Sequence, residues 1–163
     1  PLRLGREEDF ALLRDFFQRA KFDSPTLCGA LGIGGMNDFG RVDWDNIAFN
    51  SLPPLLAWCI QVFARGLPAD AASSRALCGA DVFDGFNAVG LIRQSRKNSA
   101  AVLCPVWVYP AGDFVVASDR REDPEGDPFT PPPDVVFPAI YPGTLRFLHL
   151  LPEEHWGDAL DLC

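Results

Sequence analysis

The fold class is indicated most clearly by the stretch AVLCPVWVYPAGDFVVAS at residues 101–118. β-Branched and aromatic residues fill it on both sides of Pro110–Asp113, which has the composition of a turn. The stretch therefore predicts two paired strands, 101–109 and 114–118. Pro105 lies within the first of them. Because proline cannot donate to a ladder, we expect that strand to lie at an edge or to contain a bulge.

Helical patterns precede this hairpin. Apolar residues recur at helical spacing, and proline or glycine marks several of the ends. Helices are predicted over residues 7–20, 24–31, 54–65, 68–77 and 81–89. Three helices followed by a two-stranded hairpin is the order of a winged-helix domain. Residues 1–118 are therefore predicted to form a mainly α, winged-helix-like domain with the hairpin as its wing.

The segment that follows the hairpin is acidic and rich in proline. Residues 119–134 contain six acidic residues and five prolines, which predicts a solvated linker or surface loop. Residues 1–118 carry a net charge of −1 and residues 119–163 a net charge of −7. This balance argues against partners that are polyanions, namely nucleic acids and anionic membranes.

One basic cluster qualifies this expectation. Arg93, Arg96 and Lys97 fall between the third helix of the winged-helix pattern and its wing, where such a domain would contact a phosphate backbone. Three cations on a chain of net charge −8 are more typical of a solvated loop. Contact with nucleic acid is therefore not expected.

Composition places the chain among cytoplasmic globular proteins. It has 163 residues, of which 48% are hydrophobic, and this excludes a wholly disordered chain. Its apolar runs are too short to span a membrane, and no basic-then-apolar leader opens it. The five cysteines form no C-x-x-C pair, which predicts buried free thiols in a reducing compartment and no metal site.

The sequence assigns no catalytic residue. His149 and His155 are the only imidazoles, and the possible nucleophiles Ser118 and Cys163 lie in no recognisable catalytic context. Structural or surface positions are expected for both histidines.

The last 29 residues carry a family resemblance. An extended V-V-F-P at 135–138 precedes a helix that opens with Thr144, a Leu-Pro turn, and the strand ALDLC at 159–163. This order resembles the entry into a class I S-adenosylmethionine-dependent methyltransferase domain and is similar to that of the release-factor glutamine methyltransferases. Those enzymes have an I-P-R-x-x-T-like segment before a strand L-D-L-G/C. Ala139 stands where arginine is usual, whereas Asp161 matches the acidic residue of the first cofactor motif.

The N-terminal region has a resemblance of its own. It is similar to the region that precedes the catalytic domain in a bacterial branch of these methyltransferases, where a V-x-S-D segment ends the helices and wing, here Val116–Asp119. The resemblance implies that residues 135–163 begin an α/β Rossmann-like methyltransferase domain. It also implies S-adenosylmethionine as cofactor, with Tyr141, Thr144 and Asp161 near its pocket.

The expected function is therefore the acceptor-recognition part of a methyltransferase. The glycine loop that binds the cofactor in this family would begin after residue 163, so we interpret the chain as a fragment that is inactive alone. Protein, peptide, small-molecule and RNA acceptors remain open. The alternative is a non-enzymatic winged-helix module that binds protein or nucleic acid. The apolar residues of 135–150 are expected to pack against the methyltransferase sheet, or alternatively on the winged-helix core.

Overall fold

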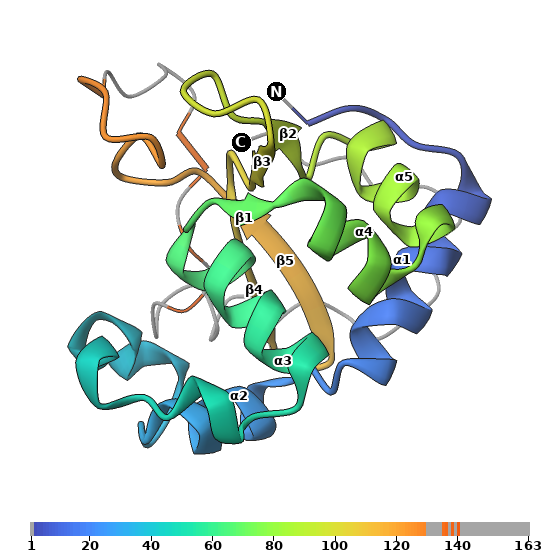
Figure 1. Cartoon of the computed structure of the whole chain (residues 1–163). Helices are drawn as coiled ribbons and strands as arrows, with labels where there is room; N and C mark the ends of the chain where they lie inside the picture. The colour runs from blue at the N-terminus through green and yellow to red at the C-terminus, as the bar shows by residue number, and fades with distance from the viewer. Residues whose placement is uncertain (1, 130–134, 137, 139, 141–163) are drawn as a thin grey trace.

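The structure is a computed structural model that describes residues 2–129, 135, 136, 138 and 140 (Figure 1). Its helices are α1 (Glu7–Arg19), α2 (Ser24–Leu31), α3 (Pro54–Cys59), α4 (Ala71–Cys78) and α5 (Ala80–Ala88). Helix α3 continues directly into the π-helix η4 (Ile60–Arg65), and three short 3-10 turns lie between α2 and α3. The described part is thus a mixture of helices and small antiparallel sheets, which is compatible with the expected mainly α domain that carries a hairpin.

Local sequence signals explain where the first helices begin and end. The first turn of α1 contains Glu7, Glu8 and Asp9, and their negative charges stabilise the helix by interacting with its dipole. Asp23 caps α2 by accepting a hydrogen bond from the Thr26 N–H at 2.8 Å. Gly32 ends α2 in the left-handed conformation, which a residue without a Cβ adopts readily.

The strands differ from the expected single hairpin over 101–118. Trp107–Ala111 (β4) and Phe114–Ser118 (β5) do pair as an antiparallel hairpin. The first part of the stretch, Ala101–Leu103 (β3), leaves it and joins a second sheet. The physical reason is Pro105, which interrupts the run between the two strands because it has no N–H to donate.

The second sheet is small and antiparallel. Its central strand β3 pairs on one side with β1 (Ala69–Asp70) and on the other with β2 (Arg93–Gln94). The order is therefore β1-β3-β2, and residues 95–100 connect its last two strands. Figure 1 shows this sheet above the longer β4-β5 hairpin.

An aromatic cluster forms the centre of the core. Phe16 of α1, Phe63 of η4 and Phe86 of α5 are fully buried, and Trp58 donates a 2.9 Å hydrogen bond to the Ser74 hydroxyl. Edge-to-face contacts at centroid distances of 5.1 Å join Phe86 to Phe16 and to Phe63. The cluster fixes α1 against α5 and η4, and so sets the position of one wall of the site described next.

Two elements predicted from the sequence lie outside the described residues: the helix that opens with Thr144 and the first strand of the α/β Rossmann-like domain at 159–163. In the described part of the chain, no helix is long and apolar enough to cross a membrane.

Candidate functional site

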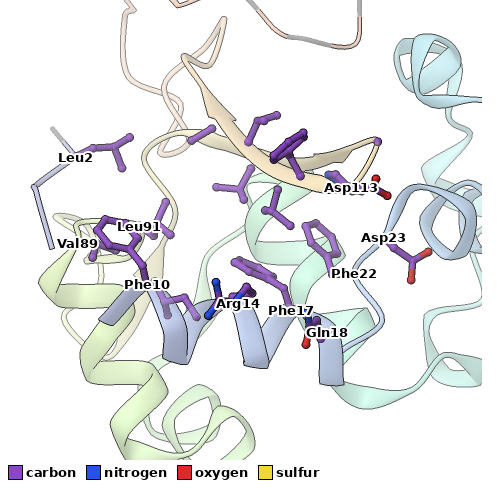
Figure 2. Close-up of a pocket in the computed structure, with 18 of the residues that line it drawn as sticks. Leu2, Phe10, Arg14, Phe17, Gln18, Phe22, Asp23, Val89, Leu91 and Asp113 are labelled. Atoms are coloured by element: carbon purple, nitrogen blue, oxygen red, sulfur yellow. The ribbon is translucent and has the colours of Figure 1, made fainter. Parts of the chain in front are cut away.

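An apolar groove lies between α1 and the β4-β5 hairpin. Its volume is about 830 Å³, which is within the range of small-ligand and peptide sites. Figure 2 shows the hairpin above α1, with the lining side chains between them. The floor and walls are lined mainly by Phe10, Leu13 and Phe17 of α1 and by Val108, Val115 and Ala117 of the hairpin.

The helical wall arises because the apolar stripe of α1 is wider than the core can cover. Leu13, Phe16 and Phe17 are buried, whereas Phe10 remains 49% exposed. Phe10 and Leu2 together line one end of the groove near Val89 (Figure 2). An exposed apolar patch that borders a concave surface is typical of a binding site.

The opposite wall is a tight hairpin. Gly112, with φ of +59°, begins its two-residue turn, a conformation that favours glycine. Phe114 follows the turn with 70% of its surface exposed, and Val115 is also exposed. Two consecutive exposed apolar residues on a strand that lines the groove leave this wall open to a partner.

Charged groups lie at defined places along the groove. Arg14 of α1 lies between Phe10 and Phe17, and Asp23 and Asp113 lie at the end near the hairpin turn (Figure 2). One carboxylate oxygen of Asp23 already accepts the capping hydrogen bond from α2. The groove is therefore mainly apolar. Arg14 lies near its middle, carboxylates lie at one end, and Arg3 is a second cation in the lining.

A second feature is an ion-pair cluster around Glu125. This carboxylate is only 1% exposed and accepts hydrogen bonds from the Ser95 hydroxyl at 2.6 Å, from Arg93 and from Arg96. Arg96 also pairs with Asp123 and Asp127, and Lys97 pairs with Asp127. The basic loop singled out in the sequence is thus covered by acids of the segment that follows the hairpin.

This cluster refines the expectation of a solvated linker or surface loop over 119–134. The described part of that segment is a loop, but the Glu125 side chain is buried against strand β2 and the loop that follows it. Arg120 is anchored as well, because its guanidinium donates to the Phe63 carbonyl at 2.7 Å and to the Cys104 carbonyl at 3.2 Å. Sequence composition could not reveal either contact, since the partners are far apart in the chain.

The cluster predicts an acid dependence of stability. Hydrogen bonds from Ser95, Arg93 and Arg96 hold the pKa of Glu125 well below its ordinary value of about 4.3. A carboxyl group with a lowered folded-state pKa stabilises the fold fully above its unfolded-state pKa, and this stabilisation is lost as the pH falls toward the folded-state value. We expect Glu125→Gln to lower the urea midpoint of unfolding at pH 7. The difference between the midpoints at pH 7 and pH 3 should be smaller than in the unchanged chain.

The matched control for this prediction is Glu122→Gln, because Glu122 is an exposed acid of the same segment. Its midpoints should follow those of the unchanged chain at both pH values. Equal midpoint shifts in the two variants at pH 7 would contradict the prediction.

Three of the cysteines are buried free thiols, as expected. Burial raises the pKa of Cys59 well above its ordinary range, the pKa of Cys78 to about 12 and that of Cys104 to about 11. These thiols are therefore protonated at neutral pH and are poor nucleophiles. Cys28 is half-buried, and its pKa is also raised by burial.

The expected cofactor residues Tyr141, Thr144 and Asp161 lie outside the described residues, as do His149, His155 and Cys163. Within the described part of the chain, no group of three or more His, Cys, Asp or Glu side chains could hold a metal ion. The groove was not predicted from the sequence. Its one local signal is the pair Phe114 and Val115, which are consecutive apolar residues that are both exposed on the strand.

Comparisons with known proteins add no family. No protein-family model matches the chain, and neither a curated protein nor a solved structure is significantly similar to it. The methyltransferase resemblance therefore depends on the residues that carry it.

Proposed function

We propose that residues 2–129 form the acceptor-recognition part of an S-adenosylmethionine-dependent methyltransferase whose cofactor domain begins within 135–163. The observation that carries the proposal is the open groove between α1 and the hairpin. It is concave, apolar and held by the aromatic core, which are the properties of a preformed binding site. The C-terminal resemblance supplies the reaction class.

The arrangement of residues 54–103 supports a winged-helix assignment for the middle of this part. A helix, a short strand, two helices and two further strands follow one another in that order, and the sheet order is β1-β3-β2. Under this assignment the wing is the loop at 95–100, which lies earlier than the hairpin expected from the sequence. The β4-β5 hairpin is then an addition to the winged-helix unit, and it forms a wall of the groove.

The role proposed for this part is orientation of the acceptor. S-adenosylmethionine supplies an electrophilic methyl group, and transfer requires the acceptor atom to approach within about 3–3.5 Å along a defined direction. A domain that binds the acceptor at a point remote from the reacting atom fixes this geometry before transfer. Assignment of Tyr141, Thr144 and Asp161 to the cofactor depends on the resemblance alone.

The alternative is a winged-helix module that binds a partner without chemistry. Its nucleic-acid form is disfavoured by the Glu125 cluster, because Arg93, Arg96 and Lys97 are all paired with acids of the same chain. A protein-binding form would use the same groove. The observation that distinguishes this binding module from the enzyme is the transfer of a methyl group.

Methyl transfer from radiolabelled S-adenosylmethionine to size-fractionated cell proteins and metabolites tests the proposal in the intact protein that contains this chain. Phe10→Glu places a charge in the apolar groove, and we expect it to lower kcat/KM for the labelled acceptor by about tenfold or more. Calorimetric affinity for S-adenosylmethionine should be unchanged, because the groove contacts the acceptor.

Leu77→Glu is the matched control, since Leu77 is a similarly exposed apolar helical residue that does not line the groove. Its kinetics should resemble those of the unchanged enzyme. Absence of any labelled acceptor would favour the non-enzymatic module. Equal losses in both variants would contradict acceptor recognition by the groove.

A further inference from the structure

The outer edge of β5, the second strand of the hairpin, carries backbone groups that have no hydrogen-bond partner among the described residues. Because two residues form the turn, the closing pair Ala111 and Phe114 exchanges hydrogen bonds, and such pairs then alternate along the ladder. Val115 and Ala117 fall in the other pairs, so their N–H and C=O groups point away from β4. Pro110, which has no N–H, stands opposite Val115 and fits this alternation. In the described part of the chain, nothing bonds to these outward groups of Val115 and Ala117, whereas the next outward N–H, that of Asp119, donates to the Val136 carbonyl at 3.1 Å.

This edge borders the groove. Val115 and Ala117 line it together with Phe10, Leu13 and Phe17 of α1. Figure 2 shows Phe10 and Phe17 on α1, below the hairpin. Free edges in natural proteins are usually blocked by a charged side chain, a proline or a covering element. The strand FVVAS carries neither a charge nor a proline. An unblocked edge that faces an apolar helix is the arrangement that receives an extended peptide as an added strand.

The charge of the groove indicates what such a peptide carries. Arg14 is exposed on the groove side of α1 and forms no ion pair with any described residue. The Arg14 guanidinium lies in the groove lining between Phe10 and Phe17, and a carboxylate on the incoming strand would pair with it through charge-assisted hydrogen bonds.

We propose that the groove binds an extended protein segment that adds to the free edge of β5 as a third strand. Alternate apolar side chains of that segment pack against α1, and an acidic side chain pairs with Arg14. The inference rests on the proposed function where it calls this segment the methyl acceptor, or a part of the acceptor protein next to the methylated residue. Binding of the segment can be measured without methyl transfer.

Hydrogen exchange of the full 163-residue chain, followed residue by residue by NMR, tests whether the edge is free. The amides of Val115 and Ala117 should exchange fast, whereas the amide of Val116, which pairs with Tyr109, should be protected. Protection of Val115 and Ala117 at every protein concentration would show that the chain covers its own edge. Protection that disappears on dilution would assign the edge to a second copy. Either result overturns the proposal.

The binding probe is a fluorescein-labelled decapeptide in which valine alternates with threonine and one central threonine is replaced by glutamate. Two analogues carry N-methyl groups on one or the other alternating set of amides. Only one set faces β5 in an added strand, so one analogue should bind at least about tenfold more weakly and the other within about twofold of the parent. Equal affinities of the two analogues, or no binding of the parent, would overturn strand addition.

Arg14→Glu tests the charge assignment, with Arg19→Glu as control on the same helix outside this groove. Arg14→Glu should weaken the glutamate peptide at least about threefold and strengthen a lysine-substituted peptide, whereas Arg19→Glu should change neither. The same response in both variants would overturn the acidic character of the ligand. Peptide binding without methyl transfer would refute the enzyme and leave this inference standing. Methyl transfer that the competing peptide does not inhibit would refute the inference and leave the enzyme.

Discussion

Replacement of Phe86 by alanine is expected to lower the free energy of unfolding by about 3–5 kcal/mol. Phe86 is fully buried, and its ring contacts those of Phe16, Phe17, Trp58 and Phe63 at centroid distances of 5.1–5.9 Å. Removing it opens a cavity where α1, α5 and η4 meet, and the edge-to-face contacts are lost as well. Urea unfolding followed by tryptophan fluorescence measures the change.

Phe83→Ala is the control for this prediction. Phe83 belongs to the same helix, but it is only half-buried, and its ring stacks under the Arg75 guanidinium at 5.6 Å. Its loss should cost about 1 kcal/mol. Similar losses in the two variants would show that the aromatic cluster is not the centre of the core. A large fall in the m-value for Phe86→Ala would instead indicate that unfolding is no longer two-state.

Most of the helical part could be predicted from local patterns, because periodicity, proline and glycine mark helices directly. Helix α1 ends at Arg19, one residue before the end expected from the sequence, and α2 has the expected bounds. The division of residues 101–118 between two sheets could not be predicted in this way. Pro105 marks where the stretch breaks, but the partners of Ala101–Leu103 are two strands of two residues each, and such short strands have no periodicity to detect.

The candidate site depends still more on contacts between distant segments. The pairing of Glu125 with Arg93 and Arg96 spans about 30 residues of chain. Composition alone therefore predicts that the acidic segment and the basic loop are two separate solvent-exposed segments. The groove arises because α1 carries one aromatic residue more than the core covers, Phe10, and because a hairpin lies opposite to it. Both features depend on tertiary packing, and neither can be predicted from a single sequence.

Arg120→Ala is expected to lower the free energy of unfolding by about 3 kcal/mol. The guanidinium of Arg120 reaches the last turns of η4 and donates to the carbonyl oxygens of Phe63 at 2.7 Å and Val62 at 3.4 Å. These are carbonyls at the negative end of a helix, where a cation is favoured. Burial lowers the pKa of Arg120 from its ordinary value, yet the group remains charged at neutral pH. The control is Arg41→Ala, whose exposed pair with Asp38 should contribute less than about 1 kcal/mol.

A double-mutant cycle with Gly66 identifies the cause of this loss. Gly66 ends η4 with φ of +80°, and a Cβ added there would lie 2.6 Å from the Arg120 guanidinium. Gly66→Ala alone therefore combines the strain of a left-handed alanine, about 1–2 kcal/mol, with displacement of the guanidinium from its carbonyls. In the Arg120→Ala background only the strain remains. The double variant should therefore lose less free energy of unfolding than the sum of the two single losses, by about 1 kcal/mol or more. Strict additivity in urea unfolding would show that Arg120 does not hold the end of η4.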